Sequence, residues 1–159
     1  MKKLALFLLL TIIIFSCKND TVYEKYYAIE DATWHAGNIL KYEVQVKDTL
    51  TSNDIYIETR HLGNYPLSNL YLFITTTAPT GRYIKDTVEI FLADNKGKWY
   101  GRGFGDIYSH THPYKRNVRF PYTGIYSFEI QHGMRVEELP GIEDIGLRIE
   151  QREMDRGEK

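Results

Sequence analysis

The alternation of apolar and polar positions predicts a chain built from β-strands. Residues 40–47 read Leu-Lys-Tyr-Glu-Val-Gln-Val-Lys, so that every second side chain is apolar. That period of two is typical of a strand with one buried face and one face in water. Residues 69–77 are apolar on both phases, which indicates a strand in the middle of a sheet.

About seven such strands are expected, and turn signals separate them. The strands are predicted at residues 40–47, 54–59, 69–77, 87–92, 117–120, 124–130 and 146–150. Turns rich in Gly, Pro and Asn fall at residues 63–66, 79–81, 94–97, 121–124 and 140–141. Tyr occurs 13 times, which also favours strands over helices. The pattern predicts an all-β fold, an antiparallel two-sheet β-sandwich of jelly-roll or Ig-like type with seven or eight strands, with a closed barrel as the alternative.

The start of the chain predicts a secretory signal peptide. Lys2 and Lys3 precede an apolar run over residues 4–15, and Ser16 follows it. This run is shorter than the roughly 20 residues that a membrane-spanning helix needs. An N-terminal membrane anchor or a buried helix is the alternative interpretation.

Cys17 is the only cysteine of the chain, so a secreted protein of this sequence has no disulfide partner for it. Residues 14–17, Ile-Phe-Ser-Cys, resemble a bacterial lipobox, in which the cysteine thiol receives a diacylglycerol before cleavage. Phe15 is bulkier than the residue usual at that place. We therefore expect lipidation at Cys17 by diacylglycerol and a fatty acid such as palmitate, with a membrane as the partner of the acyl chains.

Four segments follow from these features. We expect a lipoprotein signal peptide at 1–16, an acylated N-terminus and tether at 17–30, a β-sandwich domain at 31–150 and a charged flexible tail at 151–159. The 143 residues after the signal peptide suffice for one domain.

The charge balance excludes some partners. Cleavage removes two of the 20 basic residues and leaves 18 against 21 acidic ones, a net charge of about −3. This balance argues against nucleic-acid binding. Lys18 stands where some lipoproteins carry the aspartate that retains them at the inner membrane, so an outer-membrane location is expected.

The segment 96–115 holds the densest candidate chemistry, but no catalytic motif. Residues 101–105 lack the glycine spacing of a dinucleotide fingerprint. His110 and His112 lie two apart and would share one strand face, yet no other histidine stands at a spacing that completes a metal site. Hydrolase motifs are also missing from the sequence. We expect no metal, no cofactor and no enzyme activity.

Aromatic side chains among glycines make the same segment a candidate recognition loop. Its residues are Trp99, Tyr100, Arg102, Phe104, Asp106 and Tyr108. Exposed rings of this kind stack on sugars in secreted sandwich domains, whereas buried ones fill a core, and both interpretations stay open. The glycines are expected to let an irregular loop lie close against the sandwich.

Several segments together resemble the gliding motility lipoproteins of the GldH type. They are residues 64–73, 92–94, 97–108, 124–131 and 139–150, with Val22, Tyr23, Tyr26 and Trp34 upstream. The resemblance implies a non-catalytic envelope lipoprotein of the gliding apparatus, associated with type IX secretion, whose partners are other gliding or secretion proteins. The family site that carries over is the acylated cysteine, Cys17. A lipid-anchored glycan-binding module is the alternative, and an enzyme ranks third.

Overall fold

The computed structural model describes residues 20–152, and these form antiparallel β-sheets with one short 3-10 helix. The elements are β1 (Thr21–Ala28), η2 (Glu30–Ala32), β2 (Thr33–His35), β3 (Leu40–Val46), β4 (Asn53–Leu62), β5 (Asn69–Thr77), β6 (Tyr83–Phe91), β7 (Arg102–Phe104), β8 (Ile107–Val118), β9 (Gly124–His132), β10 (Glu138–Pro140) and β11 (Ile142–Gln151). The all-β, antiparallel prediction is confirmed.

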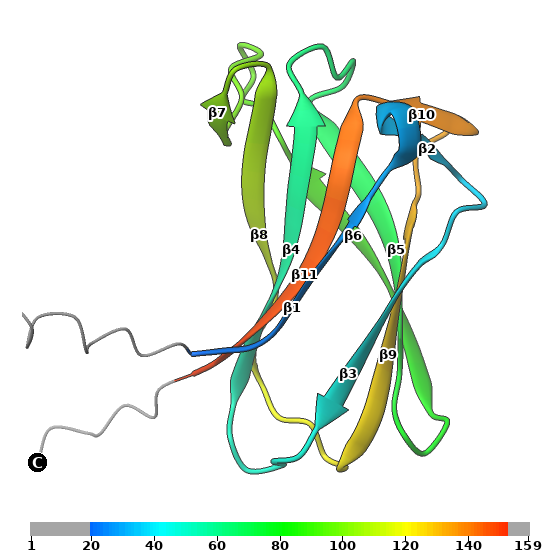
Figure 1. The fold of residues 1–159 in the computed structure, drawn as a ribbon, viewed down its shortest axis with the longest axis vertical. Coiled ribbons are helices and arrows are strands. Elements are labelled where there is room, and N and C mark those ends of the chain that lie inside the picture. The colour runs from blue at the N-terminus through cyan, green and yellow to red at the C-terminus, as the bar shows by residue number, and fades with distance from the viewer. Residues whose placement is uncertain (1–19, 153–159) are drawn as a thin grey trace, which may run out of the picture.

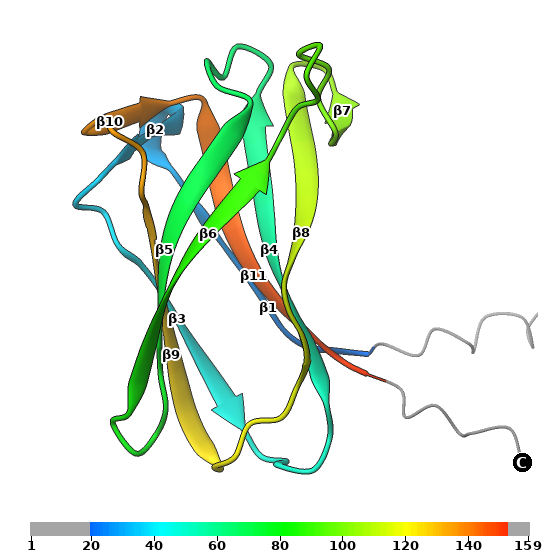
Figure 2. The same ribbon diagram turned by 180° about the vertical axis from the view of Figure 1, so that it is seen from behind.

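Two larger sheets lie face to face, and a small third sheet lies at one end (Figure 1). The five-stranded sheet has the order β1-β11-β4-β8-β7, and the four-stranded sheet has the order β3-β9-β5-β6. The third sheet pairs β10 with β2. Figure 2 shows the same layers from behind, with β5 and β6 in front of β4 and β11. Each large sheet has two edge strands, so the closed barrel is not formed by the described residues.

The core lies between the two large sheets and is built by alternation. In β3 the side chains alternate strictly between buried and exposed, so that Tyr42 and Val44 face inward. From the opposite sheet Ile57 and Leu147 meet them without solvent exposure. The hydroxyl of Tyr42 donates a hydrogen bond of 2.7 Å to the carbonyl of Ile145, which joins the sheets through the core. Its burial raises the pKa of the Tyr42 phenol.

The predicted count of seven or eight strands in two sheets is wrong, because the described residues form 11 strands in three sheets. Strands β2, β7 and β10 have three residues each, too few to show a period. Strand β8 was predicted only at its end, since His110, His112 and Pro113 mask its alternation. Beyond residue 109 it pairs only with β4, and a proline is tolerated on such a free edge.

The segment expected to be a tether at 17–30 contains a strand. Residues 21–28 form β1, which pairs with β11 along its whole length. Its sequence looked polar because β1 is an edge strand, with Tyr23 and Tyr27 turned toward the core and much of the rest exposed. At the other end of the chain, Gln151 completes β11, and residues 153–159 of the predicted tail lie outside the described part.

Candidate docking surface

The candidate recognition loop begins as an ordered turn after β6. The backbone amides of Lys96 and Lys98 donate to the Asp94 carboxylate at 2.8 and 2.9 Å. A backbone bridge then joins Ala93 to Trp99, and the amide of Tyr100 donates to the carbonyl of Leu92 at 2.8 Å. These bonds link the residues that follow β6 to those that lead toward β7. The first part of the loop therefore has a hydrogen-bonded, ordered backbone.

Two glycines let the loop and β7 lie directly against β8. A Cβ at Gly101 would stand 2.5 Å from the carbonyl oxygen of Ser109, which is backbone and has no room to give. A Cβ at Gly103 would stand 2.9 Å from the ring of Tyr108. Contacts this short are not tolerated, so glycine is required for the close approach.

Two of the predicted loop residues, Trp99 and Tyr108, are anchors and not free recognition groups. Both are half-buried and pack on the fully buried ring of His61, with centroid distances of 4.5 Å from Trp99 and 5.7 Å from Tyr108. Tyr65 lies 5.7 Å from His61 on another side. These four rings form what we call the aromatic anchor. Sequence reasoning missed His61 and Tyr65, since a lone histidine in a strand carries no signal of its neighbours.

His61 is held in a neutral form within this anchor. Burial lowers the pKa of its imidazole, and the bond to the Leu62 carbonyl opposes that effect only in part. The Nδ1 atom lies 2.9 Å from that carbonyl, so Nδ1 carries the proton and donates. Nε2 is buried with no hydrogen-bond partner among residues 20–152. A positive charge there would face aromatic rings without a counter-ion.

The other predicted loop residues point into solvent. Tyr100 is 58% exposed and Phe104 is 93% exposed, while Arg102 and Asp106 are also exposed. Strand β7 carries Arg102 and Phe104 at an outer edge of the five-stranded sheet, at the top of Figure 1. An open hollow of about 410 Å³ is lined by Asp106 of this loop and by Leu62, Gly63 and Asn64. The loop thus combines a packed base with exposed aromatic side chains, a combination that suits a candidate docking surface.

His110 and His112 lie on one face of β8, as the spacing predicts, and both are half-buried. Burial lowers the pKa of each imidazole, and for His110 the neighbouring His112 and His61 lower it further. Across residues 20–152 no group of three or more His, Cys, Asp or Glu side chains is arranged to hold a metal ion.

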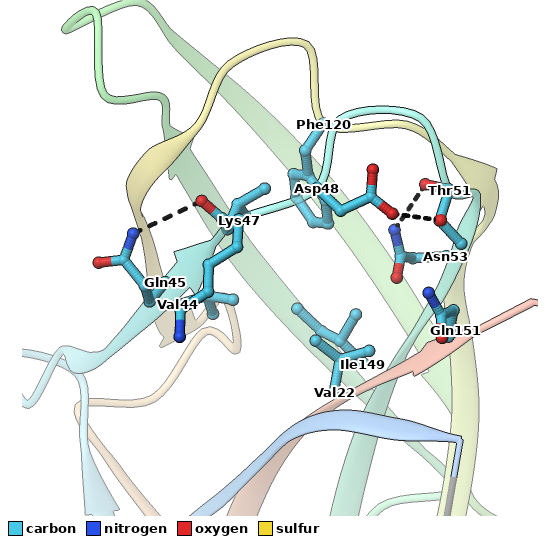
Figure 3. A pocket seen from close by; sticks show the side chains of 11 residues that line it. Val22, Val44, Gln45, Lys47, Asp48, Thr51, Asn53, Phe120, Ile149 and Gln151 are labelled. Carbon is cyan, nitrogen blue, oxygen red and sulfur yellow. Dashed lines mark hydrogen bonds between the residues drawn. The ribbon is translucent and has the colours of Figure 1, made fainter.

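A second hollow of about 390 Å³ lies between the two large sheets near the opposite end (Figure 3). Its floor is apolar, with Val44 and Phe120 on one side and Ile149 and Val22 on the other. Asp48 at its rim accepts hydrogen bonds from the hydroxyl of Thr51 and, at 2.7 Å, from the amide of Leu50. These bonds lower the pKa of the Asp48 carboxyl, the Thr51 hydroxyl most. The Asp48 carboxylate thereby holds the shape of the loop between β3 and β4.

Comparison with known proteins gives the family. The sequence profile of the GldH lipoproteins matches residues 21–149, which include all the strands that build the two large sheets apart from the last residues of β11. The chain belongs to the GldH lipoprotein family. Membership rests on the whole domain, the aromatic anchor and the exposed loop included.

Two relatives of the family are similar over nearly their full lengths. The gliding motility lipoprotein GldH homolog of Christiangramia forsetii is 37% identical over 148 residues, which cover 88% of this chain and 90% of the relative. The gliding motility lipoprotein GldH of Flavobacterium johnsoniae is 33% identical over 159 residues, or 96% of this chain and 98% of the relative.

Among solved structures the likeness is weak. A protein in the structure of infectious bursal disease virus Gx strain matches at a TM-score of 0.33 with 12% identity. The match covers 86% of this chain and 34% of that chain. A score this low carries no argument about fold or function.

The predicted lipidation site of this GldH family member, Cys17, lies outside the described residues, as does the predicted signal peptide at 1–16. Asp20 is the first described residue, and its carbonyl accepts a hydrogen bond of 2.7 Å from the amide of Gln151. The chain therefore enters the fold beside the place where β11 ends. Between residues 20 and 152 no helix is long and apolar enough to cross a membrane.

Proposed function

We propose that this protein is a lipid-anchored envelope lipoprotein that acts as a non-catalytic component of the gliding motility apparatus. Its acyl chains on Cys17 hold it in a membrane, the outer membrane in our proposal, and its loop docks on another envelope protein linked to gliding and type IX secretion. Membership of the GldH family, whose two relatives are both named gliding motility lipoproteins, is the observation that carries the proposal.

The placement of the loop supports docking away from the membrane. The chain enters at Thr21, at the lower end of β1, whereas β7 lies at the top of the molecule (Figure 1). Strand β1 has eight residues and spans about 26 Å. Three residue steps separate Cys17 from Asp20, about 10 Å at most. The acyl chains on Cys17 thus keep one end of the domain close to the lipid, and Tyr100 and Phe104 lie at the other end.

The test is a Cys17→Ser variant in a gliding host in which this gene replaces the native relative. We expect loss of metabolic acyl labelling, loss of the protein from the membrane fraction and loss of gliding. A Leu50→Ser variant is the matched control, because Leu50 is 79% exposed in the loop between β3 and β4, outside the candidate recognition loop. Continued acyl labelling of Cys17→Ser, or normal gliding by the unlabelled protein, contradicts the proposal.

One alternative, a glycan-binding module, is favoured by the exposed ring of Tyr100 together with the polar hollow that Asp106 of the same loop lines. A ring at that place stacks on a sugar, and Asn64 and Asp106 supply hydrogen-bonding groups. Retention on isolated cell-wall glycan separates the two proposals. Retention that disappears in Tyr100→Ala supports the module, whereas passage of the unmodified protein through that glycan supports docking on protein.

A further inference from the structure

A third hollow, on the outer face of the four-stranded sheet, has no place in the function proposed so far. Its volume is about 550 Å³, within the range of ligand and side-chain pockets. We call it the outer-face hollow, and its main lining residues are Leu67, Tyr71, Phe73, Met134, Arg135 and Val136.

The hollow is a built feature, because backbone contacts fix both of its walls. Tyr71 and Phe73 point outward from β5, and the segment after β9, residues 133–136, lines the other side of the hollow. The amide of Gly133 donates to the Tyr71 carbonyl at 2.7 Å, and the amide of Tyr71 lies 3.1 Å from the Met134 sulfur. A Cβ at Gly133 would stand 3.0 Å from the Phe73 ring, so this segment rests directly on that ring.

Its apolar side chains are left in water. Leu67, Tyr71 and Val136 are 38%, 36% and 47% exposed. Phe91 extends the patch and is 57% exposed. In the pairing of β5 with β6, Asn69 lies opposite Phe91 and Tyr71 lies opposite Glu89, so Phe91 is a diagonal neighbour of Tyr71. Apolar side chains that gather around a concavity, with a flexible methionine among them, mark an interaction site.

Two cationic side chains lie at the rim of the hollow. The Lys85 ammonium lies 5.3 Å from the centroid of the Phe73 ring, and Arg135 lines the hollow in an exposed position. Neither has a carboxylate partner among residues 20–152. One nearby carboxylate, Glu89, is already engaged: it accepts from the Asn69 amide at 2.6 Å and from the Tyr71 hydroxyl, a bond that raises the pKa of Tyr71.

We propose that the outer-face hollow binds a segment of a partner protein that presents a large apolar side chain flanked by carboxylates. The apolar side chain enters between Phe73, Met134 and Val136, and the carboxylates meet Lys85 and Arg135 at the rim. This inference rests on the proposed function, since the partner is an envelope protein within reach of the anchored domain.

The position of the hollow favours a protein over the lipid surface. Leu67 lies in the loop between β4 and β5, and residues 133–136 precede β10, both at the top of Figure 1. The start of β1 and the end of β11, beside which we propose the lipid surface to lie, are lower in Figure 1. A partner that meets the exposed loop at this end would also meet the hollow.

The experiment places a photo-crosslinking amino acid at position 136 of the full acylated chain in gliding cells. The matched control carries it in place of Ile125, which is 55% exposed on the same face of the same sheet but at the opposite end of β9. We expect a discrete protein adduct from position 136 whose cross-linked peptide holds an apolar residue between Asp or Glu residues. Reversal of the rim charge in Lys85→Glu/Arg135→Glu should lower its yield about tenfold.

Each other outcome overturns the inference. A lipid adduct assigns the hollow to the membrane surface, an adduct with a second copy of this chain makes it a self-association face, and a yield no higher than from position 125 leaves it without an occupant. A protein adduct that charge reversal does not weaken also contradicts it. Acyl labelling and gliding are measured on the same strains. These two measurements distinguish a failure of the proposed lipid-anchored function from a failure of the proposed binding at the outer-face hollow.

Discussion

Trp99→Ala tests the division of the loop into an anchored base and an exposed tip. The substitution removes a half-buried indole whose ring contacts lie 4.5 Å from His61, 6.0 Å from Tyr108 and 6.4 Å from Tyr65. A fully buried Trp or Phe costs about 3–5 kcal/mol when truncated to Ala. Since Trp99 is half-buried, we expect its loss to lower the free energy of unfolding by about 2 kcal/mol.

Phe104→Ala is the matched comparison, because it removes an aromatic ring of the same loop that is 93% exposed. We expect a change within about 0.5 kcal/mol. Equilibrium urea unfolding of the mature protein, followed by circular dichroism, measures both variants. An unchanged midpoint for Trp99→Ala, or an equal loss for Phe104→Ala, would refute the anchored-base reasoning.

Three further predictions concern stability. Gly101→Ala should lower the free energy of unfolding by about 1–3 kcal/mol in the same urea assay, because its Cβ would stand 2.5 Å from the Ser109 carbonyl oxygen; a gain in stability would contradict the close contact. Tyr42→Phe should cost about 1–2 kcal/mol, since it leaves the Ile145 carbonyl without its buried donor, and a neutral result would count against that bond. Burial lowers the pKa of His61, so the unfolded state takes up a proton at higher pH than the folded state, and stability should fall as pH drops through the ordinary histidine pKa of about 6.5. His61→Phe should reduce that pH dependence without removing it, because burial also lowers the pKa of His110 and His112; an unchanged slope would contradict the assignment.

The sequence predicted the fold where alternation was long and uninterrupted. The strand at residues 40–47 corresponds to β3, and residues 69–77 are β5, central in its sheet as their apolar character on both phases indicated. It did not predict β1, because an edge strand that turns few side chains toward the core looks like a polar tether. Nor did it predict the pairing of β10 with β2, whose stability comes from neighbours distant in the chain.

The aromatic residues and glycines of the sequence identified the candidate recognition loop. They did not show which of its side chains pack on the fold and which are exposed. Trp99 and Tyr100 are adjacent in sequence, yet one packs on His61 and the other stands in water. That difference depends on the bridge from Ala93 to Trp99 and on the strand that carries His61, 38 positions earlier. The outer-face hollow was missed for a related reason: its walls come from β5 and from residues 133–136, which only the folded chain brings together.

Gliding of the double variant Tyr100→Ala/Phe104→Ala tests the central claim, that the exposed tip of the loop docks the anchored domain on the motility apparatus. Both side chains are exposed, so the variant should fold and remain in the membrane fraction like the unmodified protein. The account predicts that cells carrying it, folded and acylated, lose gliding. Gliding at the normal rate by such cells would contradict it.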